Sequence, residues 1–133
     1  MKAKLDTGAR TSSIHAYDVQ EFERDGVAWA RFAVRPWQKS TDDIVVTELP
    51  VHDRRDIRSS NGQLQHRIVV RTTLSIAGHR IPTEFTLTDR DAMGFRMLVG
   101  REALRQGFLV DSGRSYYGGR PGAATRRRNR GRA

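Results

Sequence analysis

The chain has 133 residues, no cysteine and a formal net charge of +9 at pH 7. This length suits one domain with its own core, and the lack of cysteine excludes a disulfide framework. No apolar run approaches the roughly 18 residues of a membrane-spanning helix, so we expect a cytoplasmic protein without membrane contact.

The first element is a strand end that runs into a tight acidic turn, Lys4-Leu5-Asp6-Thr7-Gly8-Ala9-Arg10. Leu5 can enter a core while Asp6 lies where the strand ends, and Gly8 lets another backbone approach closely. A carboxylate held in this way suits an aspartic protease, in which two facing carboxylates share one proton and activate a water. A loop capped by aspartate has the same sequence, so the tripeptide alone is a weak signal.

Residues 11–51 predict short strands joined by polar connections. Residues 11–16 lead into a short strand, and residues 18–24 are typical of a surface turn or helical turn. Residues 27–35 alternate as a strand that Pro36 ends, with Trp29 on one face and Phe32 on the other. Residues 44–51 are a further β-rich run, bent by Pro50.

Two hairpins follow. The pair Asn61-Gly62 is a strong hairpin-turn signal within residues 53–63. Residues 67–76 and 81–87 alternate in polarity and flank Gly78-His79, which predicts a second hairpin. Strands joined in this way build an all-β domain.

The last part of the domain combines a buried strand at residues 97–99 with Gly100 and a helical turn at 102–105, and a final strand at 108–110. We place the domain at residues 1–115 and an arginine-rich tail, which we expect to be disordered, at 116–133. Because six arginines follow residue 119 and no acid follows Asp111, residues 1–119 carry a net charge of only +3. The tail is compatible with a weak RNA contact or with a solubilising role.

No metal or other cofactor is expected. Zinc needs three or four convergent donors, and the histidines show no such spacing. A lone histidine beside Ile14 suits a structural, hydrogen-bonded group. A metal hydrolase that uses these side chains therefore has little support; they are His15, His52, His66 and His79.

Together these segments resemble the RimB-like retropepsins, bacterial aspartic peptidases found beside the RimK glutamate ligase. The resemblance covers nearly the whole chain and is carried by residues 2–16, 58–62, 86–93 and 97–101. It implies an all-β, retropepsin-like (acid protease) closed β-barrel with one short helix near the C-terminus. It places the flap, the hairpin that covers the cleft, at residues 53–63, with residues 37–43 as a competing assignment. The family has a further segment before its Asp-Thr-Gly, so the resemblance also implies a shortened N-terminal segment.

Members of this family have been labelled ATP-dependent zinc proteases. The sequence has no His-Glu-x-x-His, no cysteine ligand and no Gly-x-x-x-x-Gly-Lys-Ser/Thr loop that would support that label.

A single Asp-Thr-Gly means that the second aspartate must come from another copy, so we expect a two-fold homodimer. In the family that the chain resembles, Thr7 would brace the two loops and Gly8 would let substrate backbone reach Asp6. Ala9 and Arg10 would line the cleft. Arg101 would form a structural ion pair near the dimer interface or contact substrate.

The resemblance also implies a peptide or protein substrate, a ribosomal protein that carries an oligoglutamate tail. Guanidinium groups bind carboxylates bidentately, and the chain offers several near these segments. The substrate-binding candidates are Arg10, Arg58, Arg67 and Arg101, with Arg54, Arg55 and Arg90 also available. The alternative is a noncatalytic basic module that binds ribosome or RNA on a truncated barrel of the same type.

Overall fold

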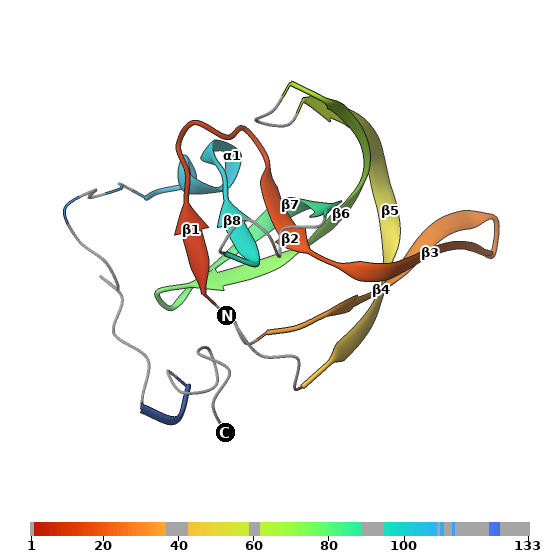
Figure 1. Ribbon diagram of the computed structural model, residues 1–133, viewed down its shortest axis with the longest axis horizontal. Helices are drawn as coiled ribbons and strands as arrows, with labels where there is room; N and C mark the ends of the chain where they lie inside the picture. Colours follow the sequence, from red (N-terminus) through yellow and green to blue (C-terminus); the bar gives the residue numbers. More distant parts are fainter. Residues whose placement is uncertain are drawn as a thin grey trace.

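The computed structural model describes residues 2–36, 43–58, 62–88, 95–108, 110, 113 and 123–125. These residues form one eight-stranded sheet and a short helix (Figure 1). The strands are β1 (Ala3–Leu5), β2 (Ser12–His15), β3 (Tyr17–Arg24), β4 (Val27–Val34), β5 (Val45–Arg58), β6 (Leu64–Ile76), β7 (His79–Thr88) and β8 (Met97–Val99), and the helix is α1 (Arg101–Leu104).

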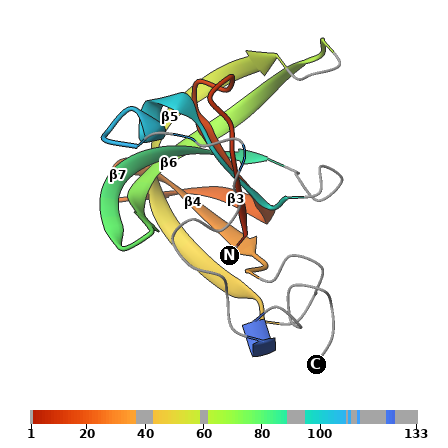
Figure 2. The same cartoon turned by 90° about the vertical axis from the view of Figure 1, so that its left-hand side faces the viewer.

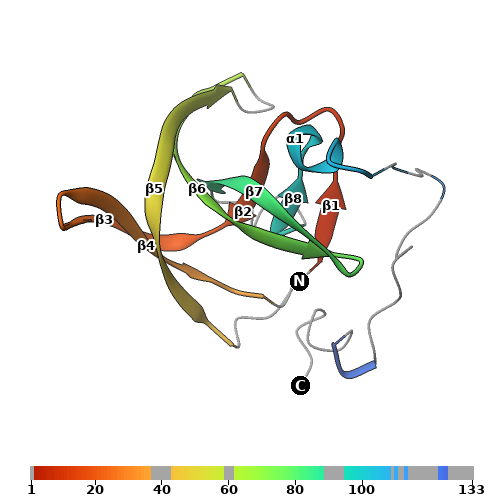
Figure 3. The ribbon, with the colours of Figure 1, turned by 180° about the vertical axis from the view of Figure 1, so that it is seen from behind.

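The sheet is open, so the expected closed barrel is wrong. Its strand order is β1-β8-β2-β7-β6-β5-β4-β3, and the edges β1 and β3 do not pair with each other. Figures 1 and 3 show the β3–β4 hairpin extending from the side opposite β1. A closed barrel has no free edge, because the first and last strands of its order pair with each other. The all-β class is confirmed.

The β3–β4 hairpin corrects the expected turn at residues 18–24, which is a strand. Its own turn lies at Asp25 and Gly26, with φ values of 52° and 79°. Two consecutive residues with positive φ form the turn that matches the natural twist of two antiparallel strands. Beyond it Phe22 stacks on Trp29 with ring centroids 6.5 Å apart. The predicted faces of β4 are confirmed, since Phe32 is buried and Trp29 is half-buried.

Two long hairpins form the middle of the sheet, as predicted. β5 continues through Pro50 and pairs with β6 from Val51↔Val70 to Arg58↔Leu64, with an irregular register between Val51 and Asp53. Gly62, with φ of 83°, belongs to the connection, while residues 59–61 lie outside the described residues, as do residues 37–42 of the competing flap. The free end of this hairpin and the β1–β2 loop lie at the same end of the molecule (Figures 1 and 2).

The β6–β7 hairpin turns at Ala77 and Gly78, which both have positive φ, one residue earlier than expected. The core lies between the strands and α1, and Ala30, Val70 and Val99 are at most 1% exposed within it. Burying such side chains stabilises the fold by about 25 cal/mol per Å².

The segment after α1 departs from the predicted final strand, because neither Phe108 nor Val110 lies in a strand. The Phe108 amide instead donates to the Leu104 carbonyl oxygen at 2.9 Å, and its ring meets His79 edge-on at 5.6 Å. Of the expected tail, residues 116–133, only residues 123–125 are described, so its disorder stays a prediction. None of the helices in the described part of the chain is long and apolar enough to cross a membrane.

Candidate active site

The Asp6 loop, residues 6–11, joins β1 to β2 around the end of β8. Because β8 lies between these two strands, the loop passes over the β8–α1 junction. The Asp6 amide donates to the Val99 carbonyl oxygen at 2.9 Å. On the other side the Arg101 and Glu102 amides donate to the carbonyl oxygens of Ala9 and Arg10. Backbone bonds therefore hold the loop from both ends.

Gly100 makes this close approach feasible. A Cβ atom built there would lie 2.7 Å from the Thr11 carbonyl carbon and 2.9 Å from the Ala9 oxygen. The Gly100 amide also donates to the Ser12 hydroxyl oxygen at 3.0 Å. The predicted placement of residues 97–99 beside the Asp6 strand is confirmed, with β1 and β8 parallel from Ala3↔Met97 to Leu5↔Val99.

The Asp6 carboxylate is fixed through one of its oxygens. The Gly8 amide donates to Oδ1 at 3.0 Å, and the Ala9 amide donates to the Asp6 carbonyl oxygen at 3.3 Å. No described residue forms a hydrogen bond with Oδ2. Thr7 and Gly8 are exposed, and Asp6 is half-buried. One oxygen thus orients the group and leaves the other without a hydrogen-bond partner among the described residues.

The predicted substrate arginines occupy different places. Arg58 ends β5 and donates from Nη1 to the Gly62 carbonyl oxygen at 3.1 Å, across the hairpin connection. Arg67 is half-buried, and its burial lowers the pKa of its guanidinium. Its partners are neutral, Gln65 Oε1 at 2.8 Å and Thr86 Oγ1 at 3.5 Å. The exposed Arg101 side chain has no hydrogen bond or ion pair with another described residue, so its interface ion pair stays a prediction.

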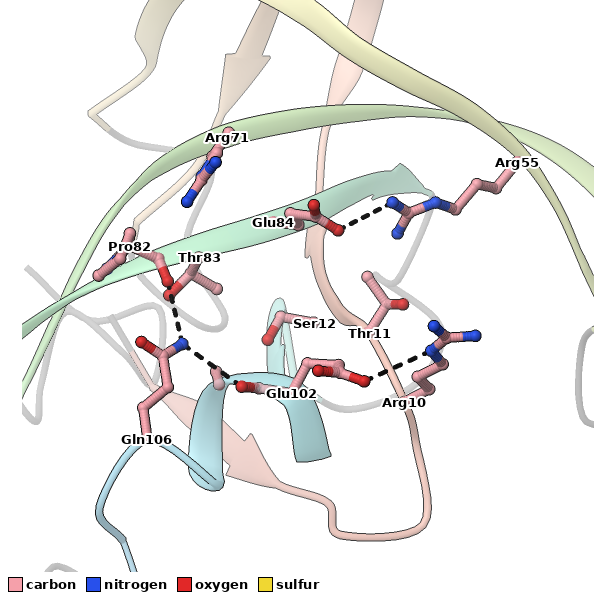
Figure 4. A pocket seen from close by; sticks show the side chains of 11 residues that line it. Arg10, Thr11, Ser12, Arg55, Arg71, Pro82, Thr83, Glu84, Glu102 and Gln106 are labelled. Atoms are coloured by element: carbon pink, nitrogen blue, oxygen red, sulfur yellow. Dashed lines mark hydrogen bonds and ion pairs between the residues drawn. The ribbon is translucent and has the colours of Figure 1, made fainter.

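A pocket of about 340 Å³ opens beside the Asp6 loop, between α1 and β7 (Figure 4). Arg10 forms an ion pair there with Glu102 at 3.5 Å, although its side chain is 77% exposed. Gln106 Nε2 donates to the Pro82 carbonyl oxygen at 3.1 Å. The pocket is lined by Arg10, Thr11, Ser12, Arg55, Arg71, Pro82, Thr83, Glu84, Glu102, Ala103 and Gln106.

Arg55 and Glu84, which line the pocket, belong to a longer chain of charged groups on β5 and β7. Arg55 donates to Asp53 Oδ2 at 2.8 Å and to Glu84 Oε2 at 2.9 Å, while His52 Nε2 lies 2.9 Å from Glu84 Oε1. Burial alone would raise the pKa of Glu84, but Arg55 and His52 hold it below its usual value. The Arg55 hydrogen bond likewise lowers the pKa of Asp53.

Sequence reasoning did not assign Arg71, Glu84, Glu102 and Gln106 to the site. Arg71 and Glu84 lie directly opposite each other on β6 and β7, and strand alternation places Arg71 on the same face as Arg67. That alternation was a usable signal for Arg71. The position of the pocket was not readable, because it depends on where β2 begins beside β7.

The histidines lie apart from one another. His15 is buried in β2, its amide donates to the Arg96 carbonyl oxygen at 2.7 Å, and its ring stacks on Tyr17. His66 pairs with Asp56 at 2.9 Å. Across the described ranges no three His, Asp or Glu side chains converge as a metal site would require.

An Asp-Thr-Gly loop held against a strand, Gly100 and a short helix in an all-β fold places the protein in the retropepsin-like class. The model of one family, described as the retropepsin-like aspartic endopeptidase RimB, matches residues 1–121. The chain belongs to this RimB-like family, as its sequence motifs predicted.

Curated relatives are larger proteins. The chain is 47% identical over 116 residues to a probable alpha-L-glutamate ligase of Shewanella halifaxensis, covering 87% of this chain and 25% of that protein. It is 43% identical over 111 residues to a probable alpha-L-glutamate ligase of Parasynechococcus marenigrum, covering 84% of this chain and 24% of that protein. The chain thus spans about a quarter of the length of the curated relatives it matches.

A solved structure shares the fold. The crystal structure of a Legionella pneumophila protein of unknown function matches with a TM-score of 0.73 at 26% identity, covering 87% of this chain and 83% of that one.

Proposed function

We propose that this protein is an aspartic endopeptidase of the retropepsin type, with a catalytic dyad made of Asp6 from each of two copies. The observation that carries the proposal is the Asp6 carboxylate, oriented through Oδ1 by the Gly8 amide in a loop that backbone bonds fix at both ends. A group held in this way loses little conformational freedom when it binds the reacting atoms.

The mechanism follows from two carboxylates that share one proton. The ionised Asp6 takes a proton from water as the water oxygen attacks the peptide carbonyl carbon, and the protonated Asp6 donates a hydrogen bond to the carbonyl oxygen. When the tetrahedral intermediate collapses, the C–N bond breaks and the leaving nitrogen takes a proton from the dyad. No metal takes part in these steps.

A homodimer is a chemical requirement of this mechanism because one chain supplies one Asp-Thr-Gly. The surface around Asp6 supports it. Leu5 is 41% exposed on the edge strand β1, and Thr7 and Gly8 are exposed. Contact between two such loops would cover this apolar side chain and bring the two carboxylates together.

For the substrate we propose an oligoglutamate tail on a protein such as a ribosomal protein. The matched relatives are named as glutamate ligases, and this chain corresponds to about a quarter of their length. A peptidase domain joined to a ligase would act on the chain that the ligase builds. Half-buried Arg67, which has only neutral partners among the described residues, is a suitable group for a substrate carboxylate.

The ligase name also favours a second candidate, a noncatalytic domain that holds the glutamate chain for another enzyme. This candidate needs the arginines and has no use for the Asp6 carboxylate. The two candidate functions therefore differ in whether they require the Asp6 side chain.

The test compares Asp6→Asn with Asp25→Asn. Asp25 lies in an exposed turn at φ of 52°, a conformation that asparagine also adopts readily. With a peptide ending in four glutamates, and cleavage followed by mass spectrometry, Asp6→Asn should lower the rate at least about 100-fold, whereas Asp25→Asn should keep it. Sedimentation should show the same dimer for both variants. Equal cleavage by both variants would reject the aspartic mechanism, and peptide binding without cleavage by the unsubstituted protein would support the second candidate.

A further inference from the structure

We infer that the pocket between α1 and β7 is a carboxylate subsite and that Arg71 is its specificity-determining residue. The inference deepens the proposed function and rests on it. It assigns one acidic side chain of the bound peptide to one place on the protein, next to the Asp6 loop.

The pocket exists because β2 is short. β2 pairs with β7 from Ser12↔Phe85 to His15↔Thr88, so residues 79–84 of β7 extend past its start. Gln106 occupies part of this open edge through the Pro82 carbonyl oxygen. The remaining space, about 340 Å³, is near the lower end of the range of small-ligand pockets, about 300–1,000 Å³. Its size suits a side chain or two of an extended peptide.

The lining carries an unbalanced positive charge. Three arginines and two glutamates line it, which gives a formal charge of +1. Arg55 is bound to Glu84 at 2.9 Å and Arg10 to Glu102 at 3.5 Å, so two of the arginines already have carboxylate partners.

Arg71 is the arginine left over. It lies directly opposite Glu84 on the β6–β7 ladder, yet both Glu84 oxygens are taken, Oε1 by His52 and Oε2 by Arg55. No hydrogen bond or ion pair joins the Arg71 guanidinium to another residue in the described part of the chain. Figure 4 shows its side chain reaching from β6 towards Pro82. A guanidinium with all its donors available is suited to bind a planar carboxylate bidentately.

The position of the pocket beside the Asp6 loop favours, as its ligand, a side chain of the peptide that Asp6 would cleave. Arg10 and Thr11 line the pocket and lie four and five residues after Asp6 on the same loop. A peptide that lies across Asp6 in an extended form advances about 3.3 Å per residue. An acidic side chain a few residues from the cleaved bond would therefore reach the part of the pocket that Arg10 and Thr11 line.

The test measures binding with catalysis silenced by Asp6→Asn. In that background we compare Arg71→Gln with Arg31→Gln, which removes the same charge from an exposed position on β4 outside the pocket. Binding of a fluorescent tetraglutamate peptide is followed by anisotropy. Arg71→Gln should raise Kd at least about tenfold, Arg71→Lys should restore part of the affinity, and Arg31→Gln should change Kd less than twofold. Melting temperatures verify that each variant folds.

The same assay locates the subsite. Peptides with glutamine in place of one glutamate at a time should show one position whose substitution weakens binding, and Arg71→Gln should abolish the penalty at that position alone. An undiminished penalty in Arg71→Gln, an absence of tetraglutamate binding, or tighter Arg71-dependent binding of a short RNA would overturn the assignment. Cleavage is measured separately, with Asp6 intact. Cleavage by Arg71→Gln at the rate of the unsubstituted protein would reject only the subsite, and Arg71-dependent binding with no cleavage by the unsubstituted protein would reject only the peptidase.

Discussion

Gly8 lies in the Asp6 loop and Gly100 packs against it, and substitution can separate their roles. In Gly100→Ala the new methyl group would lie 2.7 Å from the Thr11 carbonyl carbon, so backbone must shift. In Gly8→Ala the new methyl group would meet one atom of the described residues within 4 Å, chain neighbours aside, which is Asp6 Oδ1 at 3.2 Å. We expect Gly100→Ala to lower the free energy of unfolding by about 1–3 kcal/mol, as overpacking does. Gly8→Ala should lose less stability but should displace the carboxylate and slow cleavage. Urea denaturation measures the first effect, and equal losses in the two variants would contradict this division.

The contribution of Glu84 to the stability of the fold depends on pH. Its pKa lies below the usual 4.5 in the folded protein, because Arg55 and His52 outweigh the effect of burial. A carboxyl group with a lowered pKa stabilises the fold above its unfolded pKa and loses that contribution as pH falls through the folded value. The unsubstituted protein should therefore melt above Glu84→Gln at pH 7, and the difference should shrink below pH of about 4.5. A difference in melting temperature that stays constant from pH 7 to pH 3 would show that the ion pairs of Glu84 contribute nothing.

At the scale of elements, the sequence predicted the hairpins, because short turn motifs and alternating polarity determine them locally. Gly62 and Gly78, each part of a predicted turn, lie in connections between strands that alternate in polarity, and both hairpins were expected. The strand β3 was not, because its polar residues face solvent on both sides of an edge and hide the alternation. Asp25-Gly26 was the turn signal that would have corrected this. The pocket could not be predicted from the sequence, since it depends on contacts between β2, β7 and α1.

The β5–β6 hairpin can be tested as the flap through a matched pair of glycines. Gly62 and Gly26 both have positive φ, 83° and 79°, and a Cβ atom at either would meet no atom of the described residues within 4 Å, apart from the chain neighbours. Alanine should cost each hairpin about 1 kcal/mol through backbone strain alone. If the β5–β6 hairpin covers the cleft, only Gly62→Ala should also raise KM for a tetraglutamate peptide. Steady-state kinetics decides this, and an equal change in KM in both variants would remove the flap assignment.

At the scale of the whole molecule, an open sheet leaves edges that a second copy can use. The expected closure failed because it requires the two edge strands β1 and β3 to pair, a long-range contact that no local pattern in the sequence specifies. The edge β1 carries Leu5, 41% exposed and adjacent to Asp6. The other edge, β3, lies at the far side of the sheet (Figure 1). The loop that carries the proposed chemistry thus begins at one free edge, where a two-fold partner would complete the site.

Dimerisation through β1 predicts a concentration-dependent enzyme. Leu5→Glu should separate the copies, because two-fold symmetry places the introduced charge at the interface twice. Val27→Glu is the matched control, since Val27 is 49% exposed on β4 and close to the β3–β4 turn. Sedimentation should show the unsubstituted protein and Val27→Glu at twice 15.1 kDa and Leu5→Glu at the single value. The cleavage rate per chain should fall as the protein is diluted, and Leu5→Glu should lose activity at a higher protein concentration than the unsubstituted protein does. A fully active monomer would mean that one Asp6 suffices, which the shared-proton mechanism does not allow.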